Sequence, residues 1–129
     1  MKNYNYIVVG GGPSGIFFSL EIKNRFPNAS VLLIEKGNEI NKRICPKRKT
    51  GVCVGCNPCN ITTGFSGSGA FSDGKLTISD HGEIGGFLID YIGREKYHDL
   101  LEYTDSIYLK HGADKKLHGV DNIEDVKNI

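Results

Sequence analysis

Residues 6–35 read YIVVGGGPSGIFFSLEIKNRFPNASVLLIE and divide into three parts joined by turns. Tyr6–Val9 is a short run rich in β-branched and aromatic residues, which predicts a strand. Pro13–Arg25 carries apolar residues at helical spacing, and its leading proline suits a first helical turn, where the missing N–H is no loss. Val31–Ile34 predicts a second strand. The glycines of residues 10–15 join the first strand to the helix, so the order is strand, glycine turn, helix, strand.

The glycine turn has the spacing that a dinucleotide requires. Gly10 permits the tight turn, Gly12 lets the backbone approach a pyrophosphate without a Cβ, and Gly15 lets the helix pack closely on the strand. Glu35 follows Gly15 by twenty residues, at the end of the second strand. A carboxylate there accepts hydrogen bonds from an adenosine ribose and repels a 2′-phosphate. The residues expected around this part of the ligand are Gly10, Gly12, Pro13, Ser14, Gly15, Glu35 and Lys36.

Length, composition and charge indicate the general class of the protein. The chain has 129 residues, enough for one core, with 39% hydrophobic and 24% charged residues and a formal charge of +1. These values are ordinary for a soluble globular protein and argue neither for nor against a polyanionic partner. No apolar stretch approaches the length of a membrane span, and only four apolar residues precede the glycines, too few for a signal peptide. We therefore expect a cytoplasmic protein without a membrane partner.

The strands are too few for a finished α/β sheet. A doubly wound sheet normally has five or more strands, whereas the sequence predicts two, with residues 76–78 as a third candidate. Farther along, apolar residues at helical spacing predict a helix over residues 94–110, with Gly112 at its left-handed end. Residues 122–126 resemble the start of one more helix. The chain is therefore expected to be the N-terminal part of a longer protein.

Residues 36–75 lack periodicity and predict a long ligand-binding loop. They contain seven glycines, two prolines and all four cysteines. Within them, residues 64–75 read GFSGSGAFSDGK, whose small residues leave backbone N–H groups bare for a phosphate or the edge of a flat ring. A flexible glycine-serine linker is the alternative, but Phe65 and Phe71 are out of character for one. The residues expected to line the ligand here are Gly67, Ser68, Gly69, Ala70 and Lys75.

The four cysteines form a second candidate functional cluster. Cys45, Cys53, Cys56 and Cys59 have the spacing C-x7-C-x2-C-x2-C. Clustered thiols in a reducing compartment favour metal ligation or redox chemistry over structural disulfides. The spacing leaves three interpretations open: an iron–sulfur cluster, a zinc ion, and a metal-free dithiol or inert loop.

Five cations, Lys42, Arg43, Lys47, Arg48 and Lys49, surround the first cysteine. They are expected to lower thiolate pKa values there. A nucleic-acid partner is not predicted, because the whole chain is nearly neutral and no aromatic residue interleaves with these cations. The run is interpreted as a solvated loop, or as one that attracts an anionic substrate or cofactor.

Taken together, these motifs resemble the family of uncharacterised bacterial FAD-dependent dehydrogenases, relatives of the NAD(P)/FAD-dependent oxidoreductases. The dinucleotide motif is shared by many flavoproteins, whereas the GFSGSGAFSDGKL segment is much more distinctive. The resemblance covers nearly the whole chain, and members of the family are several times longer. The matching features are the 10–15 turn with Glu35, Cys45-Pro46, the Cys53, Cys56 and Cys59 run, residues 64–76, GFLIDYIG at 86–93 and IYLKHGA at 107–113.

The resemblance implies an α/β fold, specifically a Rossmann-like βαβ FAD-binding unit with a long Cys- and Gly-rich loop insertion and an incomplete sheet. Residues 1–129 would then be the N-terminal part of an FAD/NAD(P)-binding domain. The implied function is the FAD-binding portion of a flavin-dependent oxidoreductase, in which the flavin carries the electrons and no catalytic side chain need lie in this stretch. The chain by itself is not expected to carry the full activity. Two alternatives remain: an NAD-binding dehydrogenase without flavin, and a metal-binding or thiol redox module.

Overall fold

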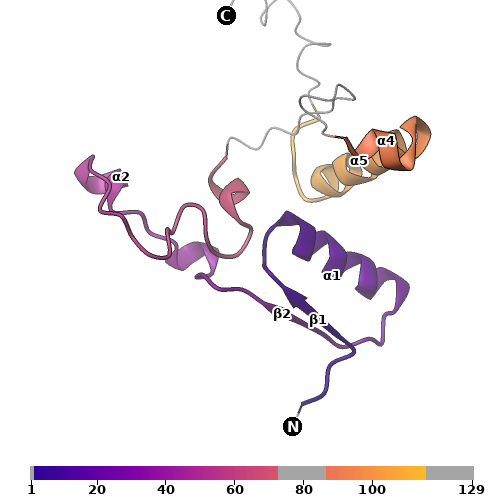
Figure 1. Ribbon diagram of the computed structural model, residues 1–129, viewed down its shortest axis with the longest axis horizontal. Coiled ribbons are helices and arrows are strands. Elements are labelled where there is room, and N and C mark those ends of the chain that lie inside the picture. Colours follow the sequence, from indigo (N-terminus) through magenta and orange to yellow (C-terminus); the bar gives the residue numbers. More distant parts are fainter. Residues whose placement is uncertain (1, 73–86, 116–129) are drawn as a thin grey trace, which may run out of the picture. The chain divides into compact units, whose positions relative to one another are not determined.

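The computed structural model describes residues 2–72 and 87–115 (Figure 1). The chain divides into two compact units, Met1–Asp73 and Gly74–Ile129. Several predicted features lie outside the described residues: Lys75, the third strand candidate at 76–78 and the helix start at 122–126.

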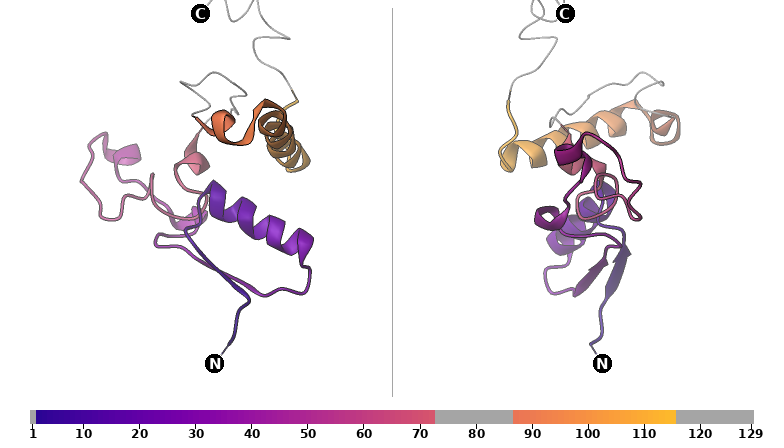
Figure 2. Two further views of the ribbon diagram at one scale, coloured as in Figure 1. Left: turned by 45° about the vertical axis from the view of Figure 1, so that its right-hand side comes forward. Right: turned by 90° about the vertical axis from the view of Figure 1, so that its left-hand side faces the viewer.

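The first unit is built on two parallel strands joined by a helix. β1 (Tyr6–Val9) pairs with β2 (Val31–Ile34), and α1 (Pro13–Arg25) connects them. The register places Tyr6 opposite Val31 and Val9 opposite Ile34. Figures 1 and 2 show α1 lying along one face of this small sheet. All three elements begin and end where the sequence predicted. A helical crossover is the usual connection between parallel neighbours.

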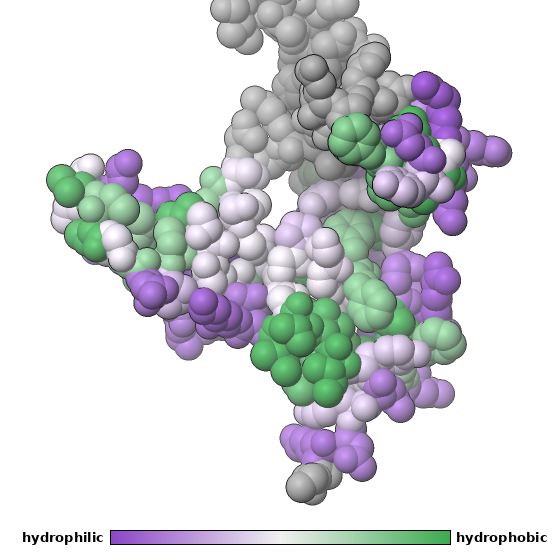
Figure 3. All heavy atoms as spheres, viewed as in Figure 1, coloured by the Kyte–Doolittle hydropathy of each residue, from purple (hydrophilic) through white to green (hydrophobic). Residues whose placement is uncertain are grey.

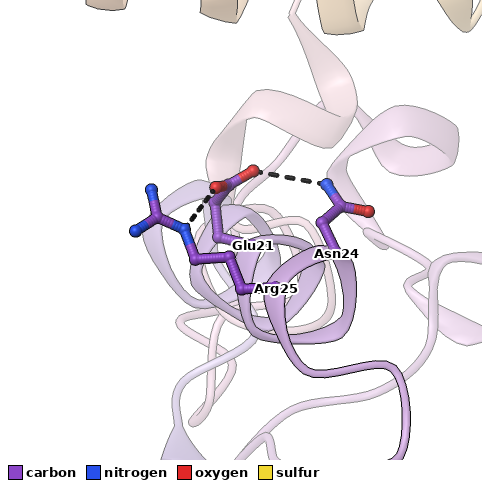
Figure 4. A network of polar contacts seen from close by, with 3 residues as sticks. All are labelled: Glu21, Asn24 and Arg25. Carbon is purple, nitrogen blue, oxygen red and sulfur yellow. Dashed lines mark hydrogen bonds and ion pairs between the residues drawn. The ribbon is translucent and has the colours of Figure 1, made fainter.

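The end of α1 is fixed by local contacts. The Phe26 N–H donates to the Ile22 carbonyl at 2.8 Å and closes the last turn. Glu21 receives two side-chain contacts on the helix surface, from Arg25 Nε at 3.3 Å and from Asn24 Nδ2 at 3.3 Å (Figure 4). Exposed contacts between residues three or four positions apart on a helix contribute about 0.2–0.5 kcal/mol each. They support the helix end but do not determine the fold.

The sheet has one covered and one uncovered face. On β1, Val8 is buried toward α1, while Ile7 and Val9 point the other way and are 62% and 82% exposed. Ile34 of β2 is exposed as well, and Figure 3 shows a hydrophobic cluster over the strands. Among the described residues, only Val8 and Tyr97 count as buried hydrophobic side chains. The first unit thus buries little apolar surface and leaves one sheet face bare.

The expectation of a Rossmann-like fold is wrong. The described residues contain a two-stranded parallel sheet and four α-helices, which is an α/β mixture but not a complete Rossmann fold. That fold needs a wider sheet with helices on both faces. A strand, a glycine turn and a helix produce this local sequence pattern whether or not further strands join the sheet. The pattern alone therefore does not establish a complete Rossmann fold.

Residues 36–72 are mostly irregular, as expected, and contain three short helical turns. These are η1 (Ile40–Lys42), α2 (Lys47–Thr50) and η2 (Ser68–Phe71). Gly51 ends α2 in the left-handed region at φ +76°. The density of glycine and proline explains why no longer element forms.

The second unit contains α4 (Leu88–Ile92) and α5 (Arg94–Lys110), which contact each other. Gly93 joins them at φ +80°, and Tyr97 is the buried side chain of α5. Gly112 lies just beyond α5 at φ +96°, and the Ala113 N–H donates to the Tyr108 carbonyl at 3.0 Å. The predicted helix at 94–110 and its glycine end are confirmed. None of the helices in the described part combines the length and apolar character that crossing a membrane requires.

Candidate functional site

The glycine turn holds α1 close to β1. Gly10 has φ +106°, and its N–H extends the strand pairing by donating to the Ile34 carbonyl at 2.8 Å. A Cβ at Gly15 would lie 2.0 Å from the Gly10 carbonyl oxygen and 3.3 Å from Val8 Cγ1. Since no side chain fits within that distance, position 15 accepts only glycine without a backbone shift. The packing role predicted for Gly15 follows from this contact.

The N-terminus of α1 is exposed and has no side-chain cap. Gly12 is the N-cap residue, with an ordinary φ of −77°, and a Cβ there would meet nothing within 4 Å. No side chain caps the helix, and its first turn holds no acidic residue. Pro13 occupies the first position and, like Ser14, is exposed. The positive end of the helix dipole is therefore left for an external anion.

Glu35 connects this turn to the end of β2. The Gly11 N–H donates to Glu35 Oε2 at 2.6 Å, and the Gly37 N–H donates to Oε1 at 2.9 Å. These backbone donors, Gly37 first and then Gly11, lower the pKa of Glu35 below its usual range, because they stabilise the charged form. Smaller contributions to the same pKa shift come from the backbone N–H groups of Gly64 and Lys36.

Folding stability should depend on the ionisation of Glu35. Because its pKa is lower in the folded chain, the contribution of Glu35 is complete above its unfolded pKa of about 4.3 and is lost as the pH falls through the folded value. Glu35→Gln is expected to reduce the urea midpoint at pH 7, with the difference from wild type shrinking as the pH drops below about 4. Glu39→Gln removes an exposed carboxylate from the same segment and serves as the control. A Glu35→Gln deficit that stays constant with pH would contradict the assigned role.

The second glycine segment folds back onto the first. The Ser66 N–H donates to the Gly11 carbonyl at 2.7 Å, with Ser66 in the left-handed region at φ +73°. A Cβ at Gly67 would lie 3.6 Å from both Gly12 Cα and Pro13 Cδ. Residues 64–67 are thus in contact with the turn, although more than fifty positions separate them in sequence. A non-glycine residue held at positive φ indicates that its surroundings impose the conformation.

Arg43 fixes this second segment. Its side chain donates to four backbone carbonyls: Nε to Asn60 at 2.9 Å, Nη1 to Phe65 and Gly67 at 2.7 Å each, and Nη2 to Ile61 at 2.6 Å. The guanidinium carbon also lies 4.7 Å from the centre of the Phe71 ring. Only 4% of Arg43 is exposed, so the interpretation of the basic run as a solvated loop is wrong for this residue. Nothing in the sequence distinguishes Arg43 from the four cations around it, and its structural role was missed.

The structure gathers half of the predicted ligand residues into one region. Gly67 meets the turn directly, and Ser68, Gly69 and Ala70 continue from it in η2. Lys36 contributes a backbone N–H near Glu35, while its side chain is exposed. The residues brought together are Gly10, Gly12, Pro13, Gly15, Glu35 and Gly67.

The four cysteines lie on a separate loop of the same unit. All are free thiols, and Cys45 is partly covered while the other three are exposed. The backbone N–H groups of Thr62 and Ile61 and the Thr62 hydroxyl lower the pKa of the Cys59 thiol, with a smaller contribution from the Arg43 charge. In the described part of the chain, no three His, Cys, Asp or Glu side chains are already gathered as a metal-binding group.

One curated relative gives the comparison with known proteins. An uncharacterized protein of Clostridium beijerinckii is 38% identical over 78 residues, which cover 58% of this chain and 14% of that protein. The chain thus matches a small part of a much longer relative. No protein-family model matches the chain, and no solved structure matches it either.

Proposed function

We propose that the chain is the FAD-binding portion of a flavin-dependent oxidoreductase. The observation that carries the proposal is the 2.6 Å hydrogen bond from the Gly11 N–H to Glu35. It places the acid suited to a ribose beside the turn suited to a pyrophosphate, and dinucleotide recognition uses both groups. The alternative is an NAD-binding dehydrogenase without flavin, since both cofactors share these two groups.

The described residues fit the diphosphate and ribose of such a cofactor. The backbone at Gly12 and the uncapped start of α1 would hold the pyrophosphate, and Glu35 would accept the ribose hydroxyls. Gly67 and η2 add a second glycine-rich wall beside the first. Residues 40–72 contain five Lys and Arg residues and no Asp or Glu, which favours an anionic ligand.

When bound, the flavin would supply the electron-transfer chemistry. The residues described above would bind and orient it, and we assign no catalytic side chain to this chain. The substrate is proposed to be a small molecule, with the electron partner unspecified. We further propose a cytoplasmic location, where free thiols such as these four persist.

The direct test is a cofactor titration. Purified chain is mixed with FAD, freed from excess and scanned from about 300 to 700 nm, with NAD⁺ and NADP⁺ titrated separately by calorimetry. Retained flavin absorption supports the proposal. Binding of NAD⁺ without flavin favours the alternative, and weaker binding of NADP⁺ is expected in either case because Glu35 repels a 2′-phosphate. Absence of any dinucleotide binding would refute both.

Gly12→Val is expected to abolish FAD binding while the chain stays folded. The new side chain meets no protein atom within 4 Å of its Cβ, so it projects into the space assigned to the pyrophosphate. We expect affinity to fall at least about 100-fold, equal to about 2.7 kcal/mol. Asn28→Val adds the same side chain at an exposed position beyond the other end of α1 and should bind normally. Undiminished FAD affinity in folded Gly12→Val would show that the pyrophosphate lies elsewhere.

A further inference from the structure

The four cysteines line one small cavity, called here the cysteine cavity. Its other lining residues include Pro46, Val54 and Asn60, and its volume is about 20 Å³. A space of that size holds a single water-sized sphere. Its lining supplies four thiol side chains, the donor set of a tetrahedral structural zinc site.

Hydrogen bonds hold the two ends of the cysteine loop together without any metal. Asn60 Nδ2, next to Cys59, donates to the Ile44 carbonyl, next to Cys45, at 2.9 Å. Arg43 Nε donates to the Asn60 carbonyl at 2.9 Å on the same side. Because the flanking residues are joined in this way, Cys45 and Cys59 are placed at one cavity before a ligand binds.

The middle of the loop is free to close on this pair. Gly51 and Gly55 lie on either side of Cys53 in the left-handed region, at φ +76° and +65°, and a Cβ at either glycine would meet nothing within 4 Å. Residues 51–59 are all exposed. Cys53 and Cys56 are therefore not locked in place by packing. A metal would supply the interaction that brings them to the other two thiols.

The charge of the surrounding segment favours an anionic centre. Residues 40–72 carry five Lys and Arg residues and no acidic residue, so their formal charge is +5. A divalent ion with four thiolates carries two negative charges. The basic segment would offset that charge. It would also favour the thiolate forms that metal ligation requires.

We propose that the four thiolates of the cysteine cavity bind one Zn²⁺ ion in tetrahedral geometry. The ion acts as a structural cross-link of the loop, since four protein ligands leave no open position for catalysis. Zinc carries out no redox step in this role. The site is independent of the FAD proposal, because it uses none of the residues assigned to that cofactor.

The test measures metal content and metal affinity on the whole chain. Chain purified under reducing, anaerobic conditions is analysed for zinc, iron and acid-labile sulfide, and is then stripped and titrated with Zn²⁺ and Co²⁺. We expect about one zinc per chain and a Co²⁺ spectrum with the intense visible bands of tetrahedral thiolate ligation. Single Cys→Ser variants at positions 45, 53, 56 and 59 should each weaken Zn²⁺ binding at least about 100-fold. Val52→Ser changes an exposed side chain of the same loop without removing a thiol and should bind zinc like wild type.

Each other outcome overturns the proposal. Iron with stoichiometric sulfide would identify a cluster instead of zinc. Four freely reactive thiols without bound Zn²⁺ would indicate an inert loop, and a disulfide found by mass spectrometry would indicate a redox pair. Zinc binding that survives all four Cys→Ser substitutions would place the ion elsewhere. FAD retention is recorded on the same samples, so failure of the zinc site is distinguishable from failure of the cofactor proposal.

Discussion

Gly15→Ala is expected to unfold the β1–α1–β2 unit. The added methyl carbon would lie 2.0 Å from the Gly10 carbonyl oxygen, a backbone atom that cannot move without breaking the turn. Replacing a helical glycine by alanine normally stabilises by about 1 kcal/mol, so the expected effect has the opposite sign. We expect a loss of more than about 3 kcal/mol, a large part of the stability of a small unit. Far-UV circular dichroism during urea denaturation measures it.

Gly12→Ala is the matched control for this experiment. It makes the same chemical change three positions earlier, where the methyl group meets nothing within 4 Å and φ is −77°. Its cost should stay below about 1 kcal/mol, the effect of replacing a glycine N-cap. An unchanged or raised urea midpoint for Gly15→Ala would show that α1 does not pack on the turn as described.

Arg43→Met is expected to release the second glycine segment from the first. The substitution keeps much of the apolar stem but leaves the carbonyls of Asn60, Ile61, Phe65 and Gly67 without the guanidinium donor. Hydrogen bonds to a charged group contribute about 1.5–3 kcal/mol each. We expect a loss of about 3 kcal/mol or more, because not all four are independent. Hydrogen exchange should show loss of protection at the Ser66 N–H, which contacts the Gly11 carbonyl.

Two further variants separate charge from geometry. Arg43→Lys keeps the positive charge but lacks the planar fork, so it should recover only part of the loss. Lys42→Met removes the neighbouring cation, whose side chain is 72% exposed, and should cost less than about 0.5 kcal/mol. Equal effects of Arg43→Met and Lys42→Met would mean that the four carbonyl contacts do not hold the segment.

If Arg43 positions residues 64–67 as described, Arg43→Met should also weaken the proposed FAD site, although Arg43 is not assigned a contact with the cofactor. The effect would pass through Gly67, which lies beside Gly12 and Pro13. This effect requires no contact between Arg43 and the cofactor, because Arg43 holds Phe65 and Gly67 through their carbonyls.

The sequence by itself determined the local elements. Both strands, the helix of the first unit and the long helix of the second were predictable because each depends on periodicity and end signals within a few residues. The glycine turn was predictable for the same reason, since Gly10 and Gly15 act on atoms within one turn of the chain. The Rossmann-like architecture was not predictable, because that fold needs further strands from segments distant in sequence, and the described residues contain two.

Only the tertiary structure decided which distant groups meet. Glu35 contacts Gly11 across twenty-four positions, and Arg43 reaches the carbonyls of residues 60–67, contacts that no local pattern encodes. Arg43 looked like the other cations of its run because the exposure of a side chain depends on tertiary contacts and not on residue type. The cysteine spacing left several chemistries open, and the structure adds that all four thiols line one cavity. The physical reason is common to all three cases. Short-range steric effects depend on neighbouring residues in the sequence, whereas burial and long-range hydrogen bonds form only when the chain folds.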